Sequence, residues 1–249
     1  MDRYTDRRVL VTGATGGLGA EICRRLAAEG AVLVLADLPS PALEEARAAL
    51  PGSGHITLDL DVSDEAQWRA AVGRVEQELG GLDVLVNNAA IGSIGTVEDE
   101  EREHWDRVMS VDATGVWLGM KHAGPLIERT GGGAIVNVAS ILGSTGGLGN
   151  SVAYHAAKGA VRTMTKNAAI HWATRGVRVN SLHPGFIETP QLLERYAGSE
   201  RHRAMLANTP MGRLGRPEEI AGAVAFLGSD DAGYLTGAEL YADGGWTAR

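Results

Sequence analysis

The chain of 249 residues has 44% hydrophobic and 22% charged side chains, an ordinary composition for a globular protein with a sizeable core. Its net charge of −8 excludes sequence-independent binding to DNA or RNA, because no basic stripe is present to neutralise phosphates. The apolar runs are strand-length, no signal-like stretch opens the sequence and Cys23 is the only cysteine, so we expect a cytoplasmic protein with no membrane partner, disulfide or cysteine-based metal site.

Short β-branched runs alternate with longer helical patterns along the chain. In chain order, the first half predicts a strand at 8–12, a helix to about residue 29, a strand at 31–36, a helix at 41–50, a strand at 56–60 and a helix at 64–79 with Ser63 as its N-cap. The second half predicts a strand at 82–86, a helical stretch at about 100–128 interrupted near Gly115 and Gly124, a strand at 134–138, a helix at 152–174, a strand at 177–182, a helix at 217–227 and a strand at 239–242. This alternation indicates an α/β protein, a single domain over residues 1–249 with a doubly wound, Rossmann-like parallel sheet.

A glycine-rich turn follows the first predicted strand, in the run Thr-Gly-Ala-Thr-Gly-Gly-Leu-Gly at 12–19. Glycines let backbone approach a pyrophosphate, and the N-terminus of the following helix favours negative charge there. Asp37 follows the second strand, where a carboxylate can accept hydrogen bonds from adenosine ribose hydroxyls and would repel a 2′-phosphate. No Arg or Lys stands at Gly16 or Leu38 to bind such a phosphate, so the sequence favours NAD over NADP.

Polar or small residues also follow the other predicted strands. They comprise Asp61 with Val62, the run from Asn87 to Ala90, Ser140, and the run from His183 to Thr189. Because the carboxyl ends of parallel strands meet at one edge of a sheet, these residues predict a ligand site at that edge.

Tyr154 and Lys158 lie four residues apart, which places both side chains on one face of the predicted helix at 152–174. A phenol normally loses its proton near pH ~10, and a nearby ammonium lowers that pKa. Such a tyrosine can take a proton from an alcohol or give one to a forming alkoxide. The pair therefore indicates acid/base chemistry.

Together these residues make the chain resemble the short-chain dehydrogenase/reductase family over essentially its full length. The matching motifs are Thr-Gly-x-x-x-Gly-x-Gly at 12–19, Asn-Asn-Ala at 87–89, Ser140, Tyr-x-x-x-Lys at 154–158, Pro-Gly at 184–185 and Asp-Gly-Gly at 243–245. Residues 208–246 look especially similar to bacterial NAD-dependent hydroxysteroid and secondary-alcohol dehydrogenases.

The resemblance implies a role for each matching residue. Ser140 would hydrogen-bond the substrate oxygen, Tyr154 would transfer its proton, and Lys158 would bind the nicotinamide ribose and lower the Tyr154 pKa. The other residues implied in NAD binding are Gly13, Thr15, Gly17, Leu18, Gly19, Asp37, Asp61, Val62, Asn88, Ala89, Ala90, Pro184, Gly185, Ile187 and Thr189.

Two positions depart from the family pattern. Asp112 stands where the family usually has an Asn that completes a proton relay with Ser140, Tyr154 and Lys158. We expect Asp112 mainly to bond nearby backbone, because the ribose hydroxyls should occupy Lys158; the alternative is a carboxylate close enough to stabilise the lysine ammonium. Ser140 and Tyr154 are also one residue further apart than usual; the glycine-rich loop between them can absorb the insertion, and Ser144 is a weaker substitute.

Three functions are compatible with these residues. The favoured one is NAD-dependent interconversion of a secondary alcohol and a ketone on an apolar substrate that is cyclic, aromatic or steroid-like. An NADPH-dependent ketoreductase of carrier-bound 3-oxoacyl groups conflicts with Asp37, and a non-enzymatic dinucleotide-binding regulator would not need Ser140, Tyr154 and Lys158. No metal motif or Gly-x-Ser-x-Gly is present, and His155 and His183 are expected at the surface or in hydrogen bonds.

Two further expectations concern the substrate and the assembly. Residues 186–212 should form a substrate lid. The apolar side chains expected in the lid and the pocket below it are Leu192, Leu193, Tyr196, Met205, Leu206, Leu142 and Leu148. The helices at 100–128 and 152–174 carry more apolar surface than one sheet face needs, which predicts a homodimer or homotetramer.

Overall fold

The computed structural model describes residues 2–249, and in this part of the chain the strands form one seven-stranded sheet. All neighbouring strands are parallel, and their order is β3-β2-β1-β4-β5-β6-β7. The strands are β1 (Arg8–Thr12), β2 (Val32–Asp37), β3 (Ile56–Asp59), β4 (Val84–Asn87), β5 (Gly133–Val138), β6 (Val177–Pro184) and β7 (Glu239–Ala242). The predicted doubly wound α/β fold is therefore confirmed.

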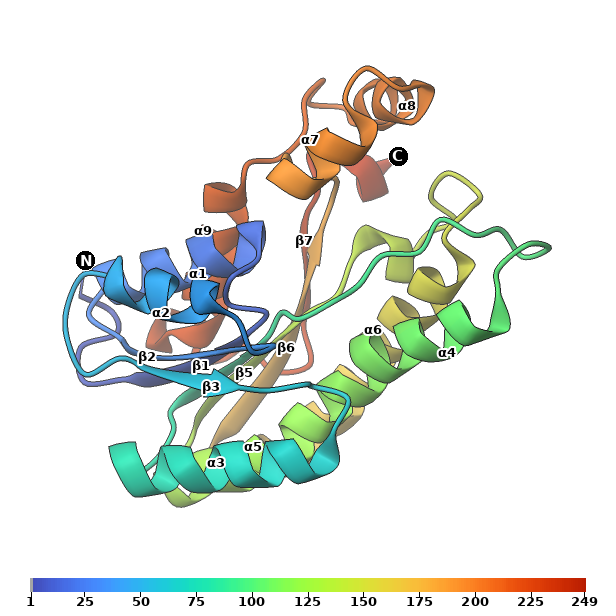
Figure 1. The fold of residues 1–249 in the computed structure, drawn as a ribbon. Coiled ribbons are helices and arrows are strands. Elements are labelled where there is room, and N and C mark those ends of the chain that lie inside the picture. The colour runs from blue at the N-terminus through green and yellow to red at the C-terminus, as the bar shows by residue number, and fades with distance from the viewer. Residues whose placement is uncertain (1) are drawn as a thin grey trace.

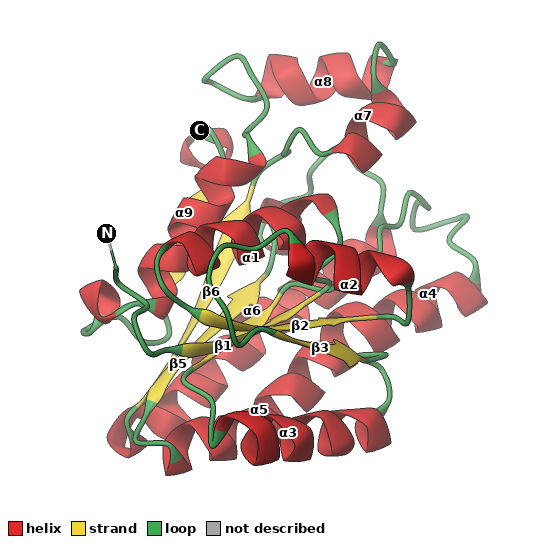
Figure 2. Cartoon of the chain, turned by 60° about the vertical axis from the view of Figure 1, so that its left-hand side comes forward, coloured by secondary structure: helices red, strands yellow, loops and turns green. Residues whose placement is uncertain are grey.

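Helices cover both faces of this sheet (Figures 1 and 2). One face carries α1 (Gly17–Ala28), α2 (Pro41–Ala48) and α9 (Pro217–Gly228). The other carries α3 (Glu65–Leu79), α4 (Arg102–Met109), α5 (Gly115–Arg129) and α6 (Val152–Trp172). Two short helices, α7 (Pro190–Tyr196) and α8 (Glu200–Asn208), project beyond the carboxyl ends of the strands.

The alternation of side chains along each strand fills two separate cores. In β1, Val9 and Val11 pack against Ile22 of α1, whereas Leu10 points to the opposite face, where Trp68 of α3 lies. Burial on both faces explains why the strands are nearly continuous apolar runs. Cys23 is buried in the α1 core, as its place in the helical pattern predicts.

The structure corrects two of the expected helices. The N-cap of α3 is Asp64, whose side chain accepts hydrogen bonds from the amides of Ala66 and Gln67, and Ser63 does not cap it. The stretch expected to break near Gly115 and Gly124 is continuous, because a π-helical turn at Ser110–Thr114 joins α4 to α5 and Gly124 lies inside α5 against the Trp172 ring. A helix that widens by one residue keeps its backbone hydrogen bonds, so no interruption is needed.

The position of the site follows from the strand order. The chain passes from β1 outwards to β2 and β3, then crosses back to pair β4 on the other side of β1. Helices on either side of this crossover leave a crevice beyond the carboxyl ends of β1 and β4, where ligands of such sheets bind. No helix in residues 2–249 has the length and apolar character needed to cross a membrane.

Candidate active site

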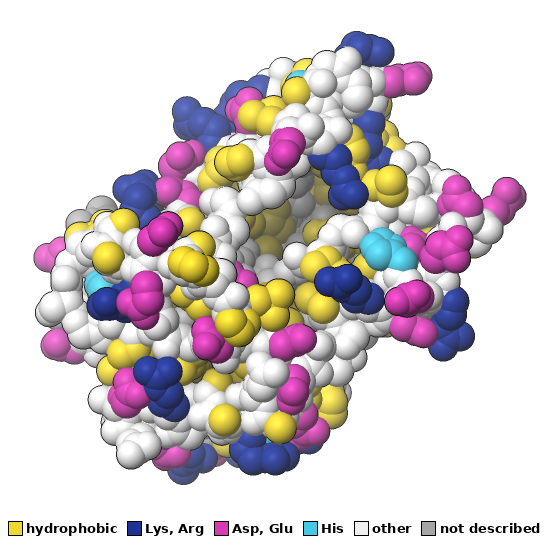
Figure 3. Space-filling model, in the orientation of Figure 1, with side chains coloured by type: hydrophobic (Ala, Val, Ile, Leu, Met, Phe, Trp, Pro, Cys, Tyr) yellow, Lys and Arg dark blue, Asp and Glu magenta, His cyan; other side chains and the backbone are white. Residues whose placement is uncertain are grey.

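A cavity of about 970 Å³ opens at the carboxyl ends of the strands, beneath α7 and α8. Figure 3 shows this hollow, with apolar side chains on its wall and Lys or Arg side chains at its rim. Every residue to which the resemblance gives a role in catalysis or NAD binding lines the cavity, except Asp112. The lining residues of that set are Gly13, Thr15, Gly17, Leu18, Gly19, Asp37, Asp61, Val62, Asn88, Ala89, Ala90, Ser140, Tyr154, Lys158, Pro184, Gly185, Ile187 and Thr189.

The glycine turn is shaped by close backbone packing. Gly13 has φ +64°, and a Cβ on Gly19 would collide with the Gly13 carbonyl oxygen, so neither position accepts a side chain without strain. The Asn88 amide clamps the turn by donating to the carbonyl oxygens of Thr12 (3.0 Å) and Gly13 (3.2 Å). Asn88 thereby satisfies backbone acceptors of the turn, whereas the buried Asn87 amide donates to the side-chain oxygen of Asn137 (2.8 Å).

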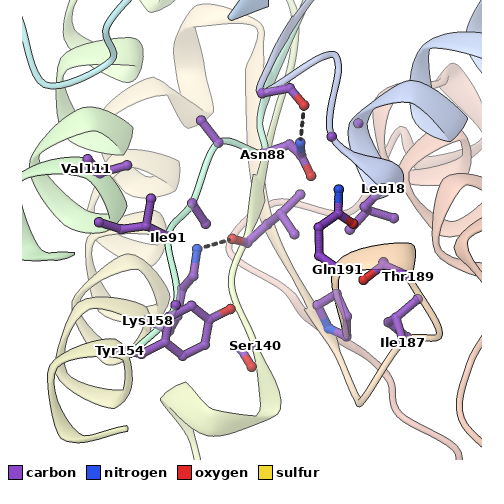
Figure 4. Close-up of a pocket in the computed structure, with 18 of the residues that line it drawn as sticks. Leu18, Asn88, Ile91, Val111, Ser140, Tyr154, Lys158, Ile187, Thr189 and Gln191 are labelled. Carbon is purple, nitrogen blue, oxygen red and sulfur yellow. Dashed lines mark hydrogen bonds between the residues drawn. The ribbon is translucent and has the colours of Figure 1, made fainter. Parts of the chain in front are cut away.

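The N-terminus of α1 faces the same cavity. Its N-cap is Gly16, no side chain caps the first amides, and the first turn contains no acidic residue. Free amides at the positive end of a helix dipole favour a phosphate-type anion. Gly17 and Leu18 lie here, opposite Thr189 and Gln191 from the α7 segment (Figure 4).

Asp37 ends β2 and is held in place by local donors. One carboxylate oxygen accepts from the Thr15 amide (2.9 Å) and the Thr15 hydroxyl (2.6 Å), and the other accepts from the Leu38 amide (2.8 Å). The side chain also lines the cavity. A fixed carboxylate without an adjacent cation is suited to ribose hydroxyls and unfavourable to a phosphate.

Tyr154 and Lys158 project from one face of α6 towards the other end of the cavity (Figure 4). The Lys158 ammonium lies 5.4 Å from the centre of the Tyr154 ring and donates to the Val138 carbonyl oxygen (3.1 Å). Burial raises the pKa of Tyr154 above its ordinary value, Lys158 lowers it, and Asp112 raises it. For Lys158, burial lowers the pKa, but the neighbouring Asp112 and Tyr154 raise it, and the net direction is upward, so the ammonium is retained at neutral pH.

Ser140 is the serine that lies beside Tyr154 (Figure 4). Its oxygen accepts a hydrogen bond from the Leu142 amide (3.1 Å) at the start of a 3-10 turn, which leaves the hydroxyl proton free to donate into the cavity. Ser144, the weaker substitute, is bonded to the Tyr241 hydroxyl (2.9 Å) and is absent from the cavity wall. Ser151, which directly precedes α6, adopts a left-handed conformation.

The structure shows both of the contacts considered for Asp112. Its carboxylate is fully buried in the π-helical turn, and Oδ2 lies 3.4 Å from the Lys158 ammonium. Oδ1 accepts a hydrogen bond from the Ile91 amide (2.8 Å), so the expected backbone bond is present as well. Asp112 does not line the cavity, and its negative charge raises the pKa of Tyr154 through space.

Several residues of the wall were missed or misplaced. Leu142, Leu192, Tyr196 and Met205 line the cavity as expected, but Leu148, Leu193 and Leu206 do not. The segment expected to form a lid contains two short helices with a break at 197–199, so one amphipathic periodicity cannot place every side chain on the same side. The missed polar residues of the wall include Ser93, Arg107, Gln191, Arg195 and Arg201, which no motif marks.

His183 supports the Ser140 backbone from behind. The ring is fully buried, with Nδ1 3.1 Å from the Ser140 carbonyl oxygen and Nε2 2.9 Å from the Ser181 hydroxyl. It stacks on Tyr241 with ring centres 4.6 Å apart. Burial lowers the pKa of His183, so the ring is neutral and its hydrogen bonds are those of an uncharged imidazole.

Comparison with known proteins agrees with this geometry. A family model described as enoyl-(acyl carrier protein) reductase matches residues 13–247. A cyclopentanol dehydrogenase of Comamonas sp. (strain NCIMB 9872) is 41% identical over 100% of both chains, and a cis-4-hydroxycyclohexanecarboxylate dehydrogenase of Sinomonas cyclohexanicum is 43% identical over 99% of both. The crystal structure of levodione reductase superposes with a TM-score of 0.92 at 38% identity, covering 98% of this chain and 99% of that one. The chain therefore belongs to the short-chain dehydrogenase/reductase family and is an oxidoreductase acting on CH-OH groups.

Proposed function

We propose that this protein is an NAD-dependent dehydrogenase that interconverts a cyclic secondary alcohol and its ketone, with Tyr154 as the acid/base. The carrying observation is that Ser140, Tyr154 and Lys158 lie at one end of a cavity whose other end holds the glycine turn and Asp37. The similarity to dehydrogenases named for ring alcohols supports a cyclic substrate. The apolar wall made by Leu142, Leu192 and Met205 supports burial of a hydrocarbon ring.

The donor set of the cavity fits a nicotinamide dinucleotide. The uncapped amides of α1 would hold the diphosphate, Asp37 the adenosine ribose, and Lys158 the second ribose. Val62 and Asp61 would flank the adenine, while Ile187 and Thr189 would hold the carboxamide. When bound, such a cofactor supplies the two-electron acceptor or donor for the carbon of the alcohol or ketone.

The side chains of the protein handle the proton. During alcohol oxidation the Tyr154 phenolate accepts the hydroxyl proton, and during ketone reduction the phenol returns it. Lys158 favours the phenolate by its charge, and burial opposes it. The free Ser140 proton can donate to the substrate oxygen, which fixes that oxygen beside the Tyr154 hydroxyl and stabilises negative charge as it develops.

The choice of NAD over NADP is tested at Asp37. Replacing Asp37 with Ala and Leu38 with Arg removes a fixed negative charge and adds a cation able to bind a 2′-phosphate. The double variant should shift the ratio of kcat/KM for the two cofactors at least tenfold towards NADP, or about 1.4 kcal/mol. An unchanged ratio would show that cofactor choice lies elsewhere.

The reaction itself is tested with cyclopentanol and cyclohexanol as substrates. The wild-type protein should oxidise them with NAD, and Tyr154→Phe should reduce kcat about 10² to 10⁴-fold while binding NAD normally. Tyr234→Phe is a matched control, since Tyr234 is fully exposed at the surface. Wild-type-like turnover by Tyr154→Phe would refute the assignment of the acid/base.

A further inference from the structure

Three arginines line the cavity, and none of them is neutralised by a carboxylate in residues 2–249. They are Arg107 on α4, Arg195 on α7 and Arg201 on α8. Elsewhere in this acidic protein cations are usually paired: Arg162 and Lys166, for example, share Glu239. Unpaired arginines in a cavity are therefore candidates for binding a ligand anion.

Arg201 is the arginine whose surroundings are best defined. Its Nη1 donates to the side-chain oxygen of Asn150 (2.6 Å), and its guanidinium lies 5.2 Å from the centre of the Tyr196 ring. Its Nε is buried and has no acceptor. Of five N–H donors, one has a protein partner, and that partner is a neutral amide.

The position of Arg201 places it near the substrate and away from the cofactor phosphates. Asn150 lies in the loop that leads into α6, four residues before Tyr154. The amides suited to a diphosphate are at Gly17 and Leu18, beside Gln191 and across the cavity from Tyr154 (Figure 4). Arg201 therefore faces the region that a substrate must occupy if its hydroxyl is to reach Tyr154.

We propose that the substrate is a cyclic secondary alcohol that carries a carboxylate, and that Arg201 binds this carboxylate. Building on the proposed function, the carbinol lies at Ser140 and Tyr154, the ring lies against the apolar wall, and the acid group meets the guanidinium. Arginine presents its two Nη groups as a planar fork, which matches the two oxygens of a carboxylate. The Arg201 donors left for a ligand are those of the Nη groups, because Nε is buried and Nη1 uses one hydrogen on Asn150.

The first test compares an acid with neutral analogues of the same shape. For 4-hydroxycyclohexanecarboxylate and its methyl ester, the wild-type kcat/KM should favour the acid at least tenfold. Arg201→Gln should lower this acid-to-ester ratio at least tenfold, and Arg201→Lys, which keeps the charge but not the fork, should lower it less. Arg203→Gln is the matched control, because Arg203 lies on the same helix, is exposed and donates only to the Gly198 carbonyl oxygen (2.9 Å). The acid-to-ester ratio of this variant should stay at the wild-type value.

The second test needs no turnover. Calorimetry of cyclohexanecarboxylate and cyclohexanecarboxamide with the NAD-saturated protein should show tighter binding of the carboxylate, and Arg201→Gln should abolish the difference. If no ring alcohol is oxidised but carboxylate binding still depends on Arg201, the proposed reaction fails and the anion site stands. If neutral ring alcohols are oxidised and both the kinetic ratio and the binding difference survive in Arg201→Gln, the anion site is overturned and the proposed reaction stands.

Discussion

The buried pair between Asp112 and Lys158 predicts a specific change in the pH dependence of alcohol oxidation. The negative charge of Asp112 raises the pKa of Tyr154, and oxidation requires Tyr154 to accept a proton. Replacing Asp112 with Asn removes that charge and therefore lowers the pKa of Tyr154. The rise of kcat/KM with pH should consequently move towards acid.

The size of this movement follows from the distances. Lys158 Nζ lies 3.4 Å from Asp112 Oδ2 and 5.4 Å from the centre of the Tyr154 ring, so the carboxylate oxygen and the ring centre are at most about 9 Å apart. Two unit charges at about 9 Å interact by about 2 kcal/mol at an effective dielectric constant of about 20. This energy corresponds to an acid movement of about 1.4 pH units.

The same substitution should also destabilise the fold. Asp112 has one oxygen towards the Ile91 amide and the other towards the Lys158 ammonium, both of which are donors. Asn can offer an acceptor to only one of them and would point its own donor at the other. Breaking a buried ion pair costs about 3–5 kcal/mol, so the melting temperature should fall, while the plateau rate should change by less than about tenfold, or ~1.4 kcal/mol.

The assay is a pH–rate profile of alcohol oxidation for the wild type and Asp112→Asn, recorded below the melting temperature of both. Asp83→Asn is the matched control, because Asp83 is a buried carboxylate paired with Arg8 (2.8 Å) at the opposite end of the strands. Asp83→Asn should lower the melting temperature and leave the pH–rate profile unchanged. An Asp112→Asn profile that coincides with that of the wild type would refute the electrostatic coupling and leave Asp112 a structural residue.

Three other outcomes follow from the structure. Lys158→Met removes the charge that lowers the pKa of Tyr154, so the pH–rate profile of alcohol oxidation should move towards alkaline pH. The variant should also bind NAD more weakly, which a binding titration with NAD would measure. His183→Phe keeps a ring that can stack on Tyr241 but removes the hydrogen-bond partner of the Ser140 carbonyl oxygen, so kcat should fall about tenfold (~1.4 kcal/mol). His183→Gln keeps a donor for that oxygen and should recover part of the lost kcat. Light scattering at micromolar concentration should show a dimer or tetramer, and a monomeric wild type would contradict the expected assembly. Ile170 on α6 is an apolar side chain that is 80% exposed, so Ile170→Glu should weaken the association of the subunits.

The sequence alone determined the features that depend on neighbours along the chain. Strand and helix periodicity predicted the parallel sheet, and the fixed four-residue spacing placed Tyr154 and Lys158 on one helix face. The glycine turn and Asp37 were also predictable, because each directly follows or ends a strand whose carboxyl end must reach the ligand edge of the sheet. Even at this level the cap of α3 was misplaced by one residue, since Ser63 and Asp64 are both good caps and only the helix geometry selects between them.

Tertiary structure decided the contacts between elements that lie far apart in the chain. Asp112 reaches Lys158 only because a π-helical turn directs it at α6, and His183 reaches the Ser140 carbonyl oxygen only because β6 pairs with β5. Arg201 meets Asn150 only because two short helices fold back over the cavity, an arrangement that apolar periodicity does not encode. Periodicity and capping act within a few residues, whereas these contacts depend on the packing of whole elements, and that is the physical reason no motif could reveal them.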